Sequence, residues 1–291
     1  MRITIFGATG LLGKTLMREW GEDQVTGLGS NDGDIRDENE VLALVQHTQP
    51  DWIVLAAACT DVDGCEANRD LAFAVNCRGA VNVARAARQQ GARLLFLSTD
   101  YVFDGAKTSP YETDDPRAAR SVYGQSKAEA EMQLREILPG CCIVRTSWLF
   151  GTGGKCFPDT ILKAAASRSQ LDVVGDQRGS PTYAVDLARA IHQLCRKEAD
   201  GIVHATNRGE CSWFEFAREI VRAAGLQTLV RETSSDKFAR AAERPKYSVL
   251  SSASLQKYGV VMPNWQDALQ RYLAERKAGA AQTERSLERH S

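Results

Sequence analysis

The chain opens with Met1-Arg-Ile-Thr-Ile-Phe-Gly-Ala-Thr-Gly-Leu-Leu-Gly-Lys14, and this stretch decides its fold. β-branched and aromatic residues fill its first half, which predicts a short buried strand. Gly7, Gly10 and Gly13 then recur at every third residue, and apolar residues at helical spacing follow them. A glycine turn between a strand and a helix lets the backbone approach a pyrophosphate, and the helix N-terminus supplies amide donors. The sequence therefore predicts a dinucleotide-binding turn here.

Strand-like and helix-like segments alternate from this turn to about residue 150. The patterns predict strands and helices in the order 52–56, 71–90, 93–97, 126–137 and 142–145. Such alternation is typical of an α/β fold with a Rossmann-type, doubly wound parallel sheet. Because ligands in these sheets lie beyond the carboxyl ends of the strands, we expect the segments that follow the strands to form the site.

Beyond about residue 150 the pattern changes, and we expect a smaller C-terminal α/β domain that covers the cleft and binds the substrate. The expected boundaries are 1–150 with about 178–206 for the NAD(P)-binding domain, and 151–177 with 207–274 for the substrate domain. The polar stretch 275–291 is expected to be a disordered tail.

Composition excludes several classes of protein. The 291 residues include 36 Lys and Arg against 37 Asp and Glu, which predicts no nucleic-acid surface. No signal peptide and no membrane-spanning run are expected. The eight cysteines form no Cys-x-x-Cys pair, so no metal site is predicted. Small core positions in a reducing cytoplasm are expected for Cys59, Cys77, Cys141, Cys142 and Cys195.

Tyr123 and Lys127 stand four residues apart in Tyr-Gly-Gln-Ser-Lys, so on a helix both side chains lie on one face. A phenol with a pKa of about 10 is a poor acid–base group at neutral pH, and a neighbouring ammonium should lower that pKa. The pair could then protonate a developing alkoxide. The spacing alone also fits a solvated helix face. The glycine turn and Ser98-Thr99, about 25 residues upstream, favour the catalytic interpretation.

Over about residues 1–273 the chain resembles the extended short-chain dehydrogenase/reductases, and within them the dTDP-4-dehydrorhamnose reductases. The glycine motif belongs to the whole superfamily. The more specific stretches are Asp34-Ile35-x-Asp37, Ser98-Thr-Asp-Tyr-Val-Phe-Asp-Gly105, Tyr123-Gly-x-Ser-Lys127, Arg145-Thr-Ser-Trp148, Asp176-Gln-x-Gly-Ser-Pro-Thr182 and Arg244-Pro245. The resemblance implies NAD(P)H-dependent reduction of a nucleotide-linked 4-keto sugar, such as dTDP-4-dehydro-L-rhamnose to dTDP-L-rhamnose.

The resemblance also implies roles for single residues. Tyr123 would be the general acid, Lys127 would tune it and hold the nicotinamide ribose, and Thr99 would hydrogen-bond the same sugar oxygen. Trp148 would pack against the sugar, although a core position is the alternative. Arg244 would either pair with the substrate diphosphate or brace an acidic residue.

The residues expected to bind the cofactor are Gly7, Gly10, Leu11 and Leu12 at the pyrophosphate, Asp34 and Ile35 at the adenine, and Ala56, Ala57 and Ala58 along its path, with Tyr123 and Lys127. Ordinary loop and core positions are the alternative for 34–35 and 56–58. The expected second strand, 25–28, is followed by Gly29-Ser-Asn-Asp32, with no acid or arginine at its immediate end. NADPH is therefore favoured over NADH. The family also leaves a Mg²⁺ ion and a homodimer possible.

Two alternatives compete with the ketoreductase. Dehydratases of the superfamily place Asp-Glu directly after the threonine, whereas Asp100 is followed here by Tyr101, which argues against a dehydratase or epimerase. The regulatory subunit of methionine adenosyltransferase shares much of the 98–105 pattern, so a non-catalytic NADP-binding subunit remains the second alternative.

Two departures from the reductases are Phe6, where threonine is common, and Lys155-Cys156-Phe157, where an asparagine usually stands beside the phenylalanine.

Overall fold

The computed structural model describes the backbone of residues 1–288 and the side chains of residues 1–279. In this part of the chain, six parallel strands form one sheet in the order β10-β5-β4-β3-β1-β2. Their bounds are β1 Arg2–Phe6, β2 Gln24–Leu28, β3 Trp52–Leu55, β4 Arg93–Thr99, β5 Cys142–Thr146 and β10 Gly201–His204. From the boundary between β1 and β3, the strands continue through β2 on one side and through β4, β5 and β10 on the other. This confirms the predicted doubly wound sheet and makes that boundary its topological switch point.

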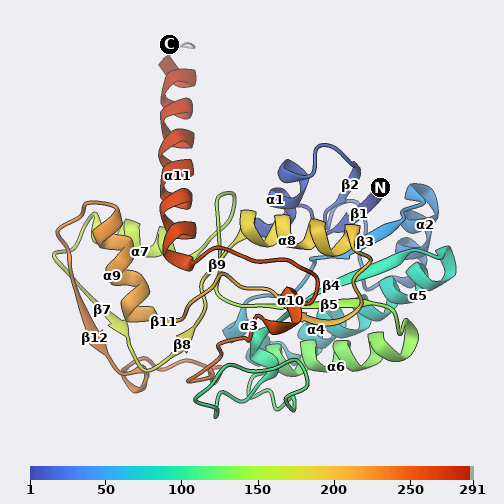
Figure 1. Ribbon diagram of the computed structural model, residues 1–291, viewed down its shortest axis with the longest axis horizontal. Helices are drawn as coiled ribbons and strands as arrows, with labels where there is room; N and C mark the ends of the chain where they lie inside the picture. The colour runs from blue at the N-terminus through green and yellow to red at the C-terminus, as the bar shows by residue number, and fades with distance from the viewer. Residues whose placement is uncertain (289–291) are drawn as a thin grey trace.

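Helices cover both faces of this sheet (Figure 1). One face carries α1 Leu11–Glu19 and α8 Ala184–Arg196, and the other carries α2 Glu38–Thr48, α5 Ala80–Gln90 and α6 Val122–Ile137. Side chains along a strand point alternately to the two layers. In β4, Leu95 and Leu97 join the core under α1 and α8, while Leu94 and Phe96 join the core under α5 and α6.

The helix predicted at 71–90 is built from three consecutive segments. It consists of α4 Arg69–Phe73, the π-helical η1 Ala74–Gly79 and α5. Wide helical turns of this kind are frequent at functional sites. The π-helical turn carries Asn76, whose side chain holds the backbone of Cys59 after β3.

The second half of the chain also supplies shorter elements around a separate apolar core. Its strands pair as β7 Gln170–Val174 with β12 Leu229–Thr233, β8 Arg178–Gly179 with β11 Cys211–Ser212, and β6 Leu149–Phe150 with β9 Thr182–Tyr183. Its larger helices are α7 Phe157–Ala165, α9 Trp213–Ala223 and α11 Trp265–Glu288. The short helical segments of the chain are α3 Val62–Ala67, η2 Asp100–Val102, η3 Ser235–Lys237 and α10 Ala253–Gln256. The residue boundaries expected for the two domains stay a prediction.

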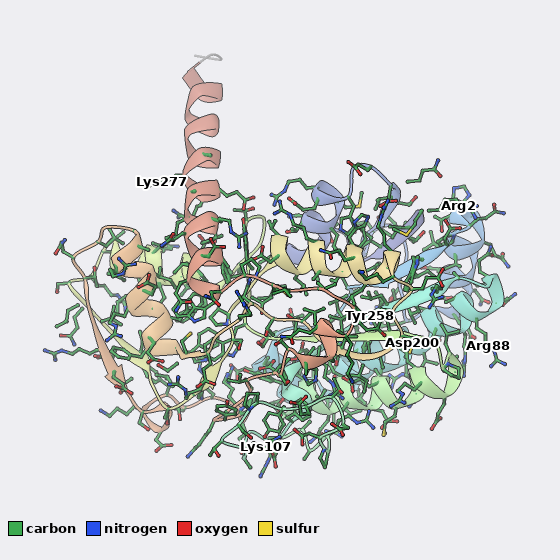
Figure 2. All side chains as sticks on the ribbon, in the orientation of Figure 1. Arg2, Arg88, Lys107, Asp200, Tyr258 and Lys277 are labelled. Carbon is green, nitrogen blue, oxygen red and sulfur yellow. The ribbon has the colours of Figure 1, made fainter. Side chains whose placement is uncertain are left out.

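The end of the chain differs from the expected disordered tail. Helix α11 continues to Glu288 and projects from the body, as the position of Lys277 in Figure 2 shows. The carboxylate of Glu275 accepts hydrogen bonds from the hydroxyls of Thr152, at 2.8 Å, and Tyr183, and it pairs with Arg18 at 2.7 Å. These contacts and the many good helix formers stabilise a helix that a purely compositional argument overlooks. Residues 289–291 lie outside the described part of the chain.

Candidate active site

A cleft of about 850 Å³ opens at the carboxyl edge of the large sheet, where β1, β3, β4 and β5 end. All residues predicted to contact cofactor or substrate line this cleft, apart from Arg244. They are Gly7, Gly10, Leu11, Leu12, Asp34, Ile35, Ala56, Ala57, Ala58, Thr99, Tyr123, Lys127 and Trp148. The individual contacts assigned to them stay predictions.

The glycine turn lies at the bottom of the cleft, between β1 and α1. Gly7 has a φ of +90°, and a Cβ placed on it would lie 2.5 Å from the Ala57 nitrogen. A Cβ on Gly13 would lie 2.1 Å from the Gly7 carbonyl oxygen. Both glycines are therefore required for strand, turn and helix to pack. A Cβ on Gly10 would meet only the Gly7 oxygen, at 3.4 Å, so this position faces the open cleft at the start of α1.

Two charged residues, Asp32 and Arg36, lie in the loop after β2, beyond the immediate strand end that was expected to lack acid and arginine. The carboxylate of Asp32 accepts a hydrogen bond from the Gly29 amide at 2.7 Å, directly after β2. Arg36 lines the cleft, and its Nε donates to Asp34 at 2.7 Å. This contact holds the pKa of Asp34 below its usual range. Neither position is adjacent to the strand in sequence, and the turn at 29–32 brings the Asp32 carboxylate back to the residue that follows it.

Thr99 and Tyr123 meet where β4 ends and α6 begins. The Thr99 hydroxyl donates to Asp100 at 3.0 Å, and the Tyr101 ring packs edge-on against Tyr123. A Cβ on Gly124 would lie 2.1 Å from the Tyr101 carbonyl oxygen, so glycine lets α6 approach this loop closely. Burial raises the pKa of Tyr123 above its usual value, although a hydrogen bond with Thr99 acts in the opposite direction. Tyr123 therefore presents a protonated phenol to the cleft, with the Thr99 hydroxyl beside it.

The expected lowering of the Tyr123 pKa by Lys127 is wrong for this structure. Burial lowers the pKa of Lys127 to about 7, against the opposing effect of Glu131. The Lys127 ammonium lies 3.9 Å from the centre of the Phe96 ring, and the side chain is 2% exposed. A lysine that is half neutral near pH 7 favours the phenolate only weakly, so the burial of Tyr123 dominates.

A buried ion pair, which sequence analysis missed, lies behind Lys127. Glu131 accepts from Arg145 at 2.6 and 2.9 Å and from the Ser98 hydroxyl at 2.5 Å, and both charged side chains are almost fully buried. Breaking such a pair leaves one uncompensated charge in the core. The sequence feature that could have indicated the position of Glu131 is its spacing from Lys127, which places the two residues one turn apart on α6.

The far end of the cleft has an aromatic wall. Trp148 has a φ of +47° and stacks on Trp213, with ring centroids 3.5 Å apart and planes at 7°. A Cβ on Gly179 would lie 2.5 Å from the Trp148 ring, which explains the glycine at that position. Trp213 and Lys155 line the same cleft. Sequence analysis missed Trp213 because α9 reaches the site only through the tertiary fold.

Arg244 takes the second of the two roles considered for it. Its guanidinium donates to both carboxylate oxygens of Asp63, at 2.7 and 3.1 Å, and lowers the pKa of Asp63 well below its usual range. Arg244 is not one of the described residues that line the cleft. A contact between Arg244 and a substrate diphosphate therefore stays a prediction.

The comparisons with known proteins agree with this geometry. The model of the RmlD substrate binding domain family matches residues 1–278. The chain belongs to this family. It is 39% identical to the spore coat polysaccharide biosynthesis protein SpsK of Bacillus subtilis, over 95% of this chain and 98% of that protein. It is also 39% identical to a dTDP-4-dehydrorhamnose reductase of Mycobacterium tuberculosis, over 94% of this chain and 92% of that enzyme.

Solved structures place this RmlD-family chain in the same group. The crystal structure of dTDP-4-dehydrorhamnose reductase from Bacillus anthracis in complex with NADP matches with a TM-score of 0.92 at 39% identity, over 94% of this chain and 99% of that one. A Thermus thermophilus UDP-glucose 4-epimerase in complex with NAD matches with a TM-score of 0.81 at 20% identity, which shows a shared fold alone. The resemblance to the extended reductases and their dTDP-4-dehydrorhamnose reductase branch is confirmed.

The described part of this RmlD-family chain contains neither a cluster of metal ligands nor a membrane-crossing helix. Within that part of the chain, no cluster of three or more His, Cys, Asp or Glu side chains is arranged to hold a metal ion. No helix in the same part is long and apolar enough to cross a bilayer. The Mg²⁺ ion that the family resemblance left possible therefore has no support in this geometry.

Proposed function

We propose that this chain reduces the 4-keto group of a dTDP-linked deoxy sugar with NADPH, and that its substrate is dTDP-4-dehydro-L-rhamnose. The observation that carries the proposal is the single cleft that joins the glycine turn, the Thr99–Tyr123–Lys127 group and the Trp148–Trp213 wall. Family membership and the NADP-bound relative support the cofactor. A homodimer and a cytoplasmic location stay predictions.

The residues of the cleft fit a dinucleotide. Gly10 leaves open space at the N-terminus of α1, where backbone amides favour a pyrophosphate. The Arg36 guanidinium in the cleft wall supplies a cation for a 2′-phosphate, although Asp34 shares it. We propose NADPH over NADH on this ground, and Gly7, Leu11, Leu12, Ile35 and the 56–58 segment as further contacts.

The proposed chemistry needs a proton where hydride arrives. NADPH, when bound, supplies hydride to the carbonyl carbon. The raised pKa keeps the Tyr123 hydroxyl protonated at neutral pH, so it can donate a proton to the oxygen as negative charge develops there. Thr99, which lies within hydrogen-bonding reach of Tyr123, would hold the same oxygen once its hydroxyl hydrogen turns from Asp100 to the substrate. Lys127 orients the ribose and, in its charged form, stabilises the phenolate that is left.

The substrate side is assigned to the aromatic wall. The flat faces of Trp148 and Trp213 suit the apolar face of a deoxy sugar or the thymine ring. Lys155 provides a cation beside them for the substrate diphosphate. Arg244 pairs with Asp63, which also accepts from the Ala242 amide, so we assign it to bracing the 240–244 loop and keep a contact with the diphosphate as the alternative.

The deciding experiment is NADPH oxidation by the purified protein with a panel of dTDP-4-keto sugars, including dTDP-4-dehydro-L-rhamnose. We expect turnover on that sugar and formation of the 4-hydroxy product. NADPH binding without turnover on any sugar of the panel would contradict the proposal and favour the non-catalytic subunit.

A further inference from the structure

We propose that Cys59 and Cys65 form a reversible dithiol–disulfide pair that controls the cleft. Their sulfur atoms lie 3.6 Å apart, and both thiols are free. A disulfide bond measures about 2.05 Å, so a small movement joins them. Cys59 lies in the loop after β3, and Cys65 lies on α3, so the bond would close only a short loop.

The two thiols differ in exposure, which sets the order of the chemistry. Cys65 is completely buried, and burial raises its pKa to about 12. Cys59 is half-buried and is therefore the sulfur that an oxidant reaches first. Disulfides in reducing compartments are usually transient and regulatory. We name a hydroperoxide as the oxidant.

The reaction balances as a two-electron oxidation. The Cys59 thiolate attacks one peroxide oxygen, the O–O bond breaks, and the second oxygen leaves as hydroxide and is protonated to water. The product is a sulfenic acid on Cys59. The Cys65 sulfur then attacks the Cys59 sulfur, the S–O bond breaks, and water leaves with the Cys65 proton. The two thiols and hydrogen peroxide become one disulfide and two waters, and a dithiol reductant reverses the change by exchange.

The position of the pair connects it to the cleft. Cys59 stands between Ala58 and Thr60, which both line the cleft. Asn76 accepts from the Cys59 amide at 2.8 Å and donates to its carbonyl at 3.1 Å and to the Ser126 hydroxyl at 3.0 Å.

The connection continues to the proposed acid. Ser126 donates to the Tyr123 carbonyl at 2.7 Å, and both cysteines pack in the small cluster that contains the Tyr123 ring. Drawing Cys59 toward Cys65 therefore displaces the cleft wall and the start of α6 together.

The test treats the protein with hydrogen peroxide and measures intact mass, a peptide map and NADPH affinity. We expect loss of two hydrogen atoms, a link between Cys59 and Cys65, and an NADPH Kd raised about tenfold, or about 1.4 kcal/mol. Dithiothreitol should restore the mass and the NADPH affinity of the untreated protein. Cys65→Ala should stop at the sulfenic acid and Cys59→Ala should not react at this site, whereas the matched core variant Cys142→Ala should behave like the wild type.

A peptide map without the 59–65 link, or a linked protein with unchanged NADPH affinity, would overturn the inference. The effect on turnover rests on the proposed function, but the mass and the affinity do not require turnover. A reduced protein that binds NADPH and loses affinity on linkage, yet reduces no keto sugar, would support the thiol pair and refute only the proposed function.

Discussion

At the scale of single residues, burial sets the chemistry of the candidate site more than neighbouring charge does. Sequence spacing correctly places Tyr123 and Lys127 on one helix face, but it gives no measure of solvent exclusion. In the folded protein the phenol holds its proton more tightly and the ammonium less tightly than in water. The resulting site begins with the proton on the tyrosine, as a reductase requires.

Replacing Tyr123 by phenylalanine keeps the ring packing and removes the proposed proton donor. General acid catalysis is worth about 10²- to 10⁴-fold, so kcat should fall by that order while NADPH affinity stays near the wild-type value. Tyr258→Phe is a matched control, because it removes a hydroxyl that contacts Asp200 (Figure 2), and neither residue lines the cleft. Near-normal turnover in Tyr123→Phe would remove this residue from the mechanism.

The lowered pKa of Lys127 predicts a pH dependence of stability. In the unfolded chain the lysine titrates near its usual 10.5, and in the folded protein it titrates at about 7. Between these values the unfolded state binds more protons, so the free energy of unfolding should rise with pH, by up to about 1.4 kcal/mol per pH unit. Below pH 7 the contribution of Lys127 to the free energy of unfolding should be constant.

Urea denaturation of the wild type and of Lys127→Met between pH 6 and 10 checks this expectation. Methionine fills the same space without a titrating group, so the difference between the two proteins isolates Lys127. Parallel curves across the whole range would show that the lysine titrates normally in the folded protein.

At the scale of elements, the strand–turn–helix at the N-terminus was predictable because its signal is local. The glycine spacing, the apolar strand and the helical repeat all lie within the first 17 residues. The Trp148–Trp213 stack and the Glu131–Arg145 pair depend on tertiary contacts between segments distant in the sequence, which a local pattern does not specify. The sequence therefore located the site and left much of its wall unassigned.

The glycine turn allows binding to be separated from folding. Gly10→Val adds a side chain that faces the open cleft, so NADPH affinity should fall about tenfold or more while the melting temperature changes little. Gly7→Ala should instead destabilise the fold, because its Cβ would meet the Ala57 backbone at 2.5 Å. Calorimetric titration and a melting curve of both variants are sufficient. Unchanged NADPH affinity in a folded Gly10→Val protein would assign the turn a structural role only.

The aromatic wall can be tested in the same way. If Trp213 contacts the sugar, Trp213→Ala should lower kcat/KM for the keto sugar roughly 10- to 100-fold, with NADPH affinity retained. The effect of Trp148→Ala should be similar, since each ring supports the other. If the stack is only core, both variants should lose about 3 to 5 kcal/mol of stability with unaltered kinetics. A melting curve and a sugar titration distinguish these outcomes.

At the scale of the whole molecule, the two ends of the chain are tied together beside the cleft. Arg18 on α1, Thr152 in the loop after β6 and Tyr183 at the end of β9 all contact Glu275 on α11. Composition predicted a loose tail at this point, because sequence alone does not show which partners a polar residue will meet. The structure makes the first turns of that segment part of the body.

Two truncations test this point. A chain that ends at residue 276 keeps Glu275, whereas one that ends at residue 274 loses it. The shorter chain should lose roughly 1 to 3 kcal/mol, because a charged hydrogen-bond acceptor is removed from partly buried partners. The longer chain should unfold like the full-length protein in urea. Equal stability of the two truncated chains would restore the view that the tail begins at residue 275.

The Glu275 contacts also impose an order on synthesis. A ribosome releases Arg18, Thr152 and Tyr183 long before it makes their common partner Glu275. Lys14 and Arg18 on α1 can already hold the 151–155 loop through Gly153 and Thr152, but the contact with Glu275 must form later. The nucleotide half can collapse while translation continues, as N-terminal domains generally do. The contact between Glu275 and this loop forms only when nearly all of the polypeptide has left the exit tunnel. A nascent chain that stalls before residue 275 would thus carry the glycine turn and the tyrosine pair but lack the contact that ties α11 to the loop beside the cleft.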